Sequence, residues 1–123
     1  MRHRVKKPKF GRQGDHTIAL LRNLVTSVIL YEKVKLTQAK AKAIAPRVEK
    51  LITLARSVES GKKSKREVIR QLDGALFDEK ASFKLLEELA PRYKDRTSGF
   101  TRITNLGPRA GDSAPMVQLE LVQ

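Results

Sequence analysis

The sequence has no cysteine, no tryptophan and no long apolar run. Without cysteine, disulfide bonds and cysteine-ligated zinc are excluded. No apolar run approaches the ~20 residues of a membrane-spanning helix. The basic N-terminus is not followed by an apolar stretch, so we expect no signal peptide. With 123 residues, 40% of them hydrophobic, the chain is expected to fold around its own core.

Aromatic residues are scarce, at 5% of the chain. Proteins that read single-stranded nucleic acid usually stack the bases on exposed aromatic rings. Most aromatic residues here lie within apolar runs, which leaves few for such stacking. If the protein binds nucleic acid, we therefore expect it to recognise mainly phosphates and shape.

Acidic residues are few, and they are unevenly distributed. The chain has 26 basic and 13 acidic residues, a net charge of +13, which indicates a polyanionic partner. Residues 1–56 contain 14 basic and 3 acidic residues, whereas residues 57–123 contain 12 and 10. The first half of the chain therefore carries most of the net charge.

The first 14 residues contain six basic residues and no acidic one. Pro8, Gly11 and Gly14 interrupt any regular pattern, and charge repulsion favours an extended chain. This segment is interpreted as a tail that binds nucleic-acid backbone; the alternative is a solvated, disordered end. We therefore divide the chain into a tail, residues 1–14, and a single domain, residues 15–123.

The first part of the domain predicts a helix, a strand and a second helix. Asp15 is expected to cap a helix over residues 16–30, whose apolar residues recur at helical spacing. The alternation at 33–36 predicts a short strand, and Thr37 is expected to cap the next helix. Pro46 lies inside that helix and is expected to bend it or to separate its first turn.

The second part predicts short helices followed by a hairpin. Ser64 and Glu67 form a capping-box pattern, and the helix after it is expected to end near Gly74. Asp78 is expected to cap another helix, and three of that helix's residues are predicted to point inward: Phe83, Leu86 and Leu89. Residues 100–106 and 116–122 alternate as strands, joined by a loop at 107–115. The predicted fold is α+β, with several helices packed on a small three-stranded mixed sheet.

Four basic residues of the second helix are predicted to share one face and to bind RNA: Lys40, Lys42, Arg47 and Lys50. A merely solvated face is the alternative.

His3 and His16 lack the further ligands that a metal site needs, and His16 is interpreted as a phosphate contact. Arg109 is either a turn residue or an RNA contact.

A catalytic site is not apparent in the sequence. The neighbouring carboxylates Asp78-Glu79 and Glu87-Glu88 diverge by about 100° on a helix, so neither pair converges on a substrate. The segment 61–64, Gly-Lys-Lys-Ser, has an extra lysine and lacks the earlier glycine of a phosphate-binding loop. We predict that the protein is not an enzyme and that it uses no cofactor and no small-molecule substrate.

Six segments resemble the bacterial large-subunit ribosomal protein family L-seventeen. They are MRHR at the start, Gly11-Arg12 with His16, Ala19 and Leu21-Arg22-Asn23, VKLTQAKAKAI at 34–44, VEKLITLAR at 48–56, APRYKDRTSGFTRI at 90–103 and GPRAGDSAPMVQLELV at 107–122. The order of the six makes the resemblance specific. Ser98 departs from the usual two glycines before the aromatic residue at position 100, and Gly14-Asp15 departs from the Ser or Asn of several members.

The resemblance implies an α+β fold with a small three-stranded sheet and no catalytic activity. It also implies binding to 23S ribosomal RNA beside neighbouring large-subunit proteins, near the polypeptide exit region, in the bacterial cytoplasm and away from membranes. The residues expected to contact RNA are Arg2, His3, Arg4, Lys6, Lys7, Lys9, Arg12, His16, Arg22, Lys35, Lys40, Lys42, Arg47, Lys50, Arg96, Arg102 and Arg109. A free regulatory or architectural DNA-binding protein is the competing hypothesis. It would require a groove-reading helix with polar base-contacting residues or a self-complementary dimer surface, and we find no such helix.

Overall fold

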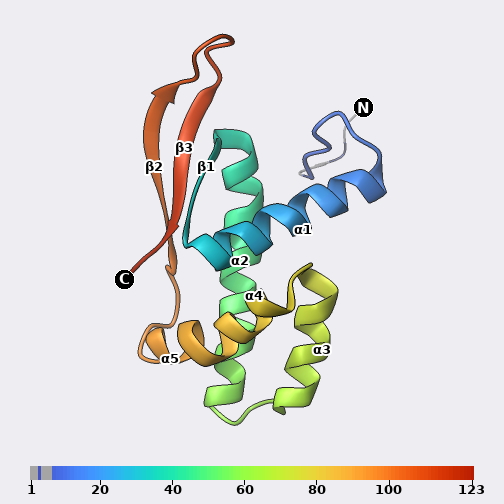
Figure 1. The fold of residues 1–123 in the computed structure, drawn as a ribbon, viewed down its shortest axis with the longest axis vertical. Helices are drawn as coiled ribbons and strands as arrows, with labels where there is room; N and C mark the ends of the chain where they lie inside the picture. The colour runs from blue at the N-terminus through green and yellow to red at the C-terminus, as the bar shows by residue number, and fades with distance from the viewer. Residues whose placement is uncertain (1–2, 4–6) are drawn as a thin grey trace.

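The computed structural model describes residue 3 and residues 7–123 (Figure 1). The chain forms a helical body with a three-stranded sheet along one side, an α+β fold as predicted. The helices are α1 (Gly14–Tyr31), α2 (Gln38–Glu59), α3 (Lys65–Ala75), α4 (Glu79–Lys84) and the short α5 (Ala90–Arg92), with a π-helical turn at Leu85–Leu89 between the last two. The strands are β1 (Lys33–Thr37), β2 (Thr101–Pro108) and β3 (Pro115–Leu121).

Helix α2 is the centre of the molecule. It contacts α1, α3, α5, the π-helical turn and all three strands. Its buried residues recur every three or four positions and form one apolar stripe: Ala41, Ile44, Val48, Ile52 and Ala55. Pro46 lies on an exposed part of the helix, which continues through it without a break. Of the two alternatives expected for Pro46, the separation of the first turn is wrong, and the bend stays a prediction.

The sheet has the order β1-β3-β2, and both pairings are antiparallel. The expectation of a mixed sheet was wrong in this detail. β1 and β2 do run in the same direction, but β3 lies between them, so no parallel pair forms. On β3, Val117, Leu119 and Leu121 are buried, as their alternation predicted. Between Asn105 and Gly107 the register of β2 on β3 shifts by a bulge. Residues 102–108 of β2 are all exposed, Leu106 among them.

The helix ends test the predicted caps. Ser64 accepts a hydrogen bond from the Glu67 N–H, and Asp78 accepts one from the Lys80 N–H, so both caps are confirmed. Asp15 is not the cap, because α1 begins at Gly14 and Asp15 lies inside its first turn. The Asp15 carboxylate accepts a hydrogen bond from the N–H of His16. Thr37 holds the predicted cap position, but its side chain makes no capping hydrogen bond.

Phe83 was wrongly assigned to the core, because it is 55% exposed. The buried residues here are the pairs Ala81-Ser82, Leu85-Leu86 and Leu89-Ala90, which repeat every four residues. A helix turns about 100° per residue, so Phe83 lies beyond the edge of that stripe. Leu86 and Leu89 are buried as predicted.

Candidate nucleic-acid interface

The N-terminal segment folds back beside α1. The N–H of Arg12 donates to the Lys9 carbonyl (3.1 Å), and the Thr17 hydroxyl is 3.1 Å from the same oxygen. Phe10 and Gly11 both have a positive φ, and the half-buried Phe10 ring packs against the core. Residues 9–12 thus form a turn instead of an extended chain. The turn places the basic side chains of this segment along α1.

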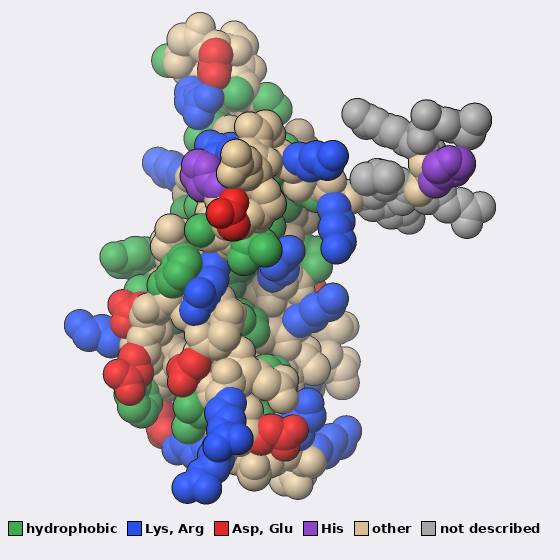
Figure 2. Space-filling model, turned by 90° about the vertical axis from the view of Figure 1, so that its right-hand side faces the viewer, with side chains coloured by type: hydrophobic (Ala, Val, Ile, Leu, Met, Phe, Trp, Pro, Cys, Tyr) green, Lys and Arg blue, Asp and Glu red, His purple; other side chains and the backbone are tan. Residues whose placement is uncertain are grey.

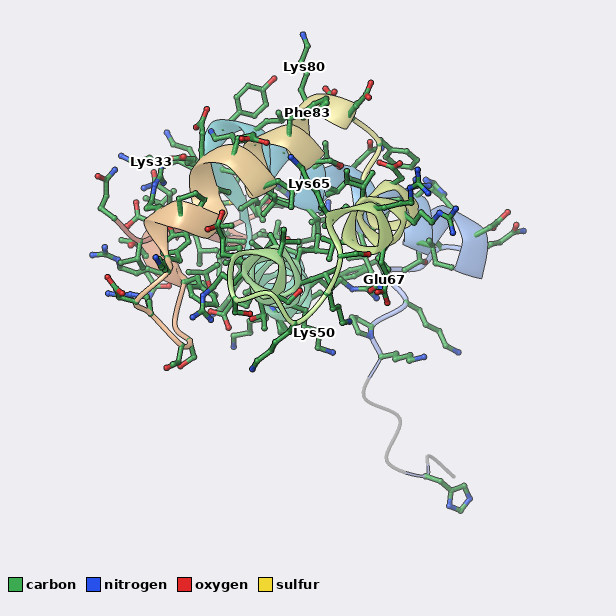
Figure 3. The ribbon with its side chains drawn as sticks, turned by 90° about the horizontal axis from the view of Figure 1, so that it is seen from below. Lys33, Lys50, Lys65, Glu67, Lys80 and Phe83 are labelled. Carbon is green, nitrogen blue, oxygen red and sulfur yellow. The ribbon has the colours of Figure 1, made fainter. Side chains whose placement is uncertain are left out.

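The turn, α1 and α2 enclose a groove of about 670 Å³, which we call the basic groove. Its lining consists of Lys7, Pro8, Lys9, Arg12, Gly14, Thr17, Ile18, Leu21, Ala43 and Arg47. A smaller depression of about 230 Å³ shares Ile18, Leu21 and Arg47 with it and extends along α2 to Lys50. In Figure 3, Lys50 lies on the side of the molecule from which the N-terminal segment leaves, opposite Lys80 and Phe83.

The charges of the basic groove are not neutralised by its own lining. Four described residues of the lining are basic (Lys7, Lys9, Arg12 and Arg47), and none is acidic. None of the ion pairs among the described residues involves these four side chains or Lys50. Figure 2 shows basic side chains gathered beside the N-terminal segment, whereas acidic and basic side chains are mixed further down the same face. The groove therefore presents a local positive field that favours an anion.

Different parts of the structure position the side chains of Arg12 and Arg47. Arg12 Nη1 donates to the Phe10 carbonyl at 2.8 Å, which holds its guanidinium at the turn. Arg47 extends from α2, a helix that the buried core anchors. An arginine fork can bind a phosphate through two hydrogen bonds, and a lysine binds it as a point charge. The groove thus offers anion-binding side chains from two elements of the fold.

Helical geometry separates the four basic residues predicted on α2. Arg47 and Lys50 line the two hollows, and Lys40, which is half-buried, lies on nearly the same side as Arg47. Lys42 lies about 200° around the helix from Lys40, since each residue adds about 100°. The expectation that all four share one face was therefore wrong for Lys42.

Arg22 was predicted to contact RNA, but its guanidinium is bound within the protein. Its Nη2 donates to the carbonyl oxygens of Asp73 (2.8 Å) and Leu76 (2.9 Å). The guanidinium carbon also lies 4.1 Å from the centre of the Phe77 ring. These contacts join α1 to the end of α3 and to the segment that follows it, so Arg22 has a structural role in the protein. Arg22 also lines the smaller depression, and its contact with RNA stays a prediction.

The predicted residues near the sheet lie apart from the groove, and most have partners. Arg102 Nε is 3.3 Å from Glu120, Arg96 Nη1 donates to the Gly99 carbonyl, and Arg109 forms a bidentate pair with Asp112 at the hairpin tip. The hydrogen bonds from Arg109 lower the pKa of the Asp112 carboxyl to about 2. Lys35 is exposed on the outer face of β1.

The remaining predicted residues lie at the N-terminal end. His16 is exposed in the first turn of α1, and His3 is exposed as well. Arg2, Arg4 and Lys6 lie outside the described residues. The structure thus brings Lys7, Lys9, Arg12, Arg47 and Lys50 to one surface. It adds Ile18, which sequence reasoning had wrongly assigned to the buried face of α1. Leu21 also lines this surface, but it is buried as predicted.

A second cluster was missed entirely. Glu32, at the C-terminal end of α1, is 2.9 Å from Arg92 Nη2 and 3.3 Å from Lys84 Nζ. The hydrogen bond from Arg92, followed by that from Lys84, lowers the pKa of Glu32 against the opposing effect of burial. The partners lie 52 and 60 residues further along the chain, so no local pattern could have predicted the cluster. It secures the junction of α1 and β1 to the later helices.

Comparison with known proteins places the chain in a family. The profile described as "Ribosomal protein L17" matches residues 20–122. The large ribosomal subunit protein bL17 of Caldanaerobacter subterraneus subsp. tengcongensis is 45% identical over 114 residues, which cover 93% of this chain and 96% of that protein. The protein of the same name from Geobacter sulfurreducens is 42% identical over all 123 residues, which cover 67% of its own length. The chain therefore belongs to the ribosomal protein L17 family.

Proposed function

We propose that the protein is a structural constituent of the bacterial large ribosomal subunit, where it binds 23S ribosomal RNA mainly through backbone phosphates. The observation that carries this proposal is the basic groove, whose described lining has four basic residues and no acidic one. Unpaired cations at fixed positions can replace the counterions of RNA phosphates. Membership of a ribosomal protein family supports the same conclusion.

Family membership, and not the lack of a catalytic site, identifies the chain as a structural protein and not an enzyme. In the part of the chain that the structure describes, no helix has the length and apolarity to cross a membrane.

The proposal includes an arrangement of the chain and a location. Residues 1–14 act as the RNA-binding tail of the domain formed by residues 15–123. The turn at 9–12 supports a role for this tail, because it brings the tail's cations to the groove. The protein works on the cytoplasmic ribosome, close to the polypeptide exit region and beside other large-subunit proteins.

A salt titration with matched charge variants tests the phosphate contacts. The double variant Arg47→Glu, Lys50→Glu should bind 23S ribosomal RNA at least about tenfold more weakly, with a smaller dependence of log affinity on log salt. Lys62→Glu, Lys63→Glu makes the same change of net charge in the exposed loop after α2 and serves as the control. Equal losses for the two variants would show that net charge, and not the groove, governs binding.

The absence of cysteine allows a second test, of location. Gln13→Cys, beside the groove, and Lys62→Cys, at the far end of α2, each create one attachment point for an iron chelate that cleaves nearby RNA. Strong cleavage of 23S RNA from position 13, at sites around the exit region, is the expected result. Strong cleavage from position 62 alone would contradict the proposed orientation, and cleavage elsewhere in the subunit would contradict the location.

A further inference from the structure

The floor of the basic groove has a composition that phosphate binding does not explain. Ile18 is 62% exposed, whereas four other apolar residues of α1 are buried: Leu21, Val25, Val28 and Ile29. Leu21 and Ala43 line the same hollow as Ile18. A surface that contacted only phosphates would gain nothing from an apolar floor, because phosphate oxygens need donors and cations. The groove therefore has a second component that is suited to an uncharged, flat and apolar group.

We propose that the basic groove accepts a single unstacked RNA base on the Ile18 floor, while the flanking phosphates bind the surrounding cations. This inference rests on the proposed RNA binding and adds to it. The groove volume of about 670 Å³ lies within the range of about 300–1,000 Å³ that is usual for small-molecule sites. RNA-binding proteins commonly take up bases that have left the stack in loops and bulges.

The charges around the floor identify the occupant as nucleic acid. An aromatic side chain from a neighbouring protein would fit the floor, but it would leave four cations without counterions. A nucleotide supplies both components at once, since its base is apolar on its faces and its backbone is anionic. Cations from both the N-terminal turn and α2 surround the floor, so phosphates on either side of the base can be bound.

The groove also provides a group that can stack on a base. Arginine guanidinium planes stack on bases, and the hydrogen bond from Arg12 to the Phe10 carbonyl restrains one such plane at the groove. The scarcity of aromatic residues therefore does not exclude base recognition here. The groove relies on an aliphatic floor and a restrained arginine in place of an aromatic ring.

The test uses two single-stranded probes of equal charge. One is a ten-nucleotide oligoadenylate RNA, and the other is a ribose-phosphate chain of the same length without bases. The full-length wild-type protein should bind the oligoadenylate about fivefold or more tightly than the abasic chain, the lower end of the range known for stacked bases. Ile18→Ser should remove this preference and leave affinity for the abasic chain unchanged.

Two further variants keep the test decisive. Phe83→Ser removes a larger exposed apolar side chain on the opposite side of the molecule and should leave the preference intact. Ile18→Phe should increase the preference by adding an aromatic face, and it answers the question even if Ile18→Ser fails to fold.

Equal, salt-dependent binding of both probes to wild type would overturn the base site and leave phosphate binding standing. A preference that survives Ile18→Ser would also overturn it. Failure of both probes to bind would overturn the proposed RNA binding itself.

Discussion

The cations of the basic groove differ in their partners from the five basic residues of the later helices and hairpin that form ion pairs. In the basic groove, the cations Lys7, Lys9, Arg12 and Arg47 have no acidic neighbour in the described lining. In the later half, Arg92 pairs with Glu32, Arg102 with Glu120 and Arg109 with Asp112. Paired cations hold elements of the fold together, whereas unpaired cations remain available to a polyanion. The same residue types therefore serve two purposes, and the placement of acidic residues decides which.

The largest effect is expected from breaking the sheet. Leu119 is fully buried on the central strand β3. Leu119→Asp would place a carboxylate without a partner in the core, and the cooperative thermal transition followed by circular dichroism should be lost. RNA affinity should fall only as a consequence of unfolding. A variant that melts like wild type would show that the sheet is not needed for the fold.

The next largest effect is expected from reversing a charge in the basic groove, compared with the same change on the other side of α2. Arg47→Glu should weaken 23S RNA binding by about tenfold, while Lys42→Glu, the same change on the other side of α2, should have a clearly smaller effect. Both side chains are exposed, so both variants should keep the free energy of unfolding within about 0.5 kcal/mol of wild type. Parallel RNA titrations and melts measure this. Equal losses of affinity would remove the distinction between the two faces.

A substitution at Glu32 tests whether its ion pairs with Lys84 and Arg92 stabilise the fold. Glu32→Gln should lower the free energy of unfolding by about 1 kcal/mol, because Arg92 and Lys84 lose a partly buried carboxylate, with little change in RNA affinity. The folded-state pKa of Glu32 is lowered, so its contribution is complete above its unfolded value of 4.5 and is lost as the pH falls through the folded value. Melts of wild type and variant should therefore differ at pH 7 and converge in acid. A difference that persists unchanged in acid would contradict the ion-pair explanation.

The smallest effect is expected at the hairpin tip. Asp112→Asn releases Arg109 from its pair, and RNA affinity at low salt should rise by less than about threefold, since one more cation becomes free. In the wild-type protein, the pKa of the Asp112 carboxyl is lowered from its ordinary value of 3.8 to about 2. The ion pair with Arg109 is therefore intact above pH 3.8 and is lost only as the pH falls through about 2. NMR titration of the Asp112 carboxyl carbon measures this pKa directly. A drop in affinity would show that the pair itself contributes to binding.

Most elements of the fold could be predicted because their signals are local. Alternation at 33–36 and 116–122 depends on neighbours two residues apart, and the caps Ser64 and Asp78 depend on neighbours two or three residues away. Some errors were local, such as the cap at Asp15 and the burial of Phe83. The error in the sheet arose because two distant segments had to be combined. Strand order decides whether a sheet is mixed. The residues of β1 and β2 alone do not indicate that β3 lies between these two strands.

The candidate site was only partly predictable. Composition alone indicates that the first half carries the excess charge, and the basic groove lies there. The predicted face on α2 was wrong for Lys42, although helical geometry alone would have revealed this. For Arg22 no such check exists, because its hydrogen-bond acceptors lie 51 and 54 residues away.

The sequence by itself determined the helices and strands, the asymmetry of charge and the family resemblance, because each is written in residues close together or in composition. Only the tertiary structure decided which cations are free. Glu32 forms ion pairs with Lys84 and Arg92, which lie more than 50 residues further along the chain. The turn at Lys9–Arg12 brings cations beside Arg47 without an acidic neighbour in the described lining. Electrostatic interactions depend on distance in space, and the fold alone sets that distance for residues far apart in the chain.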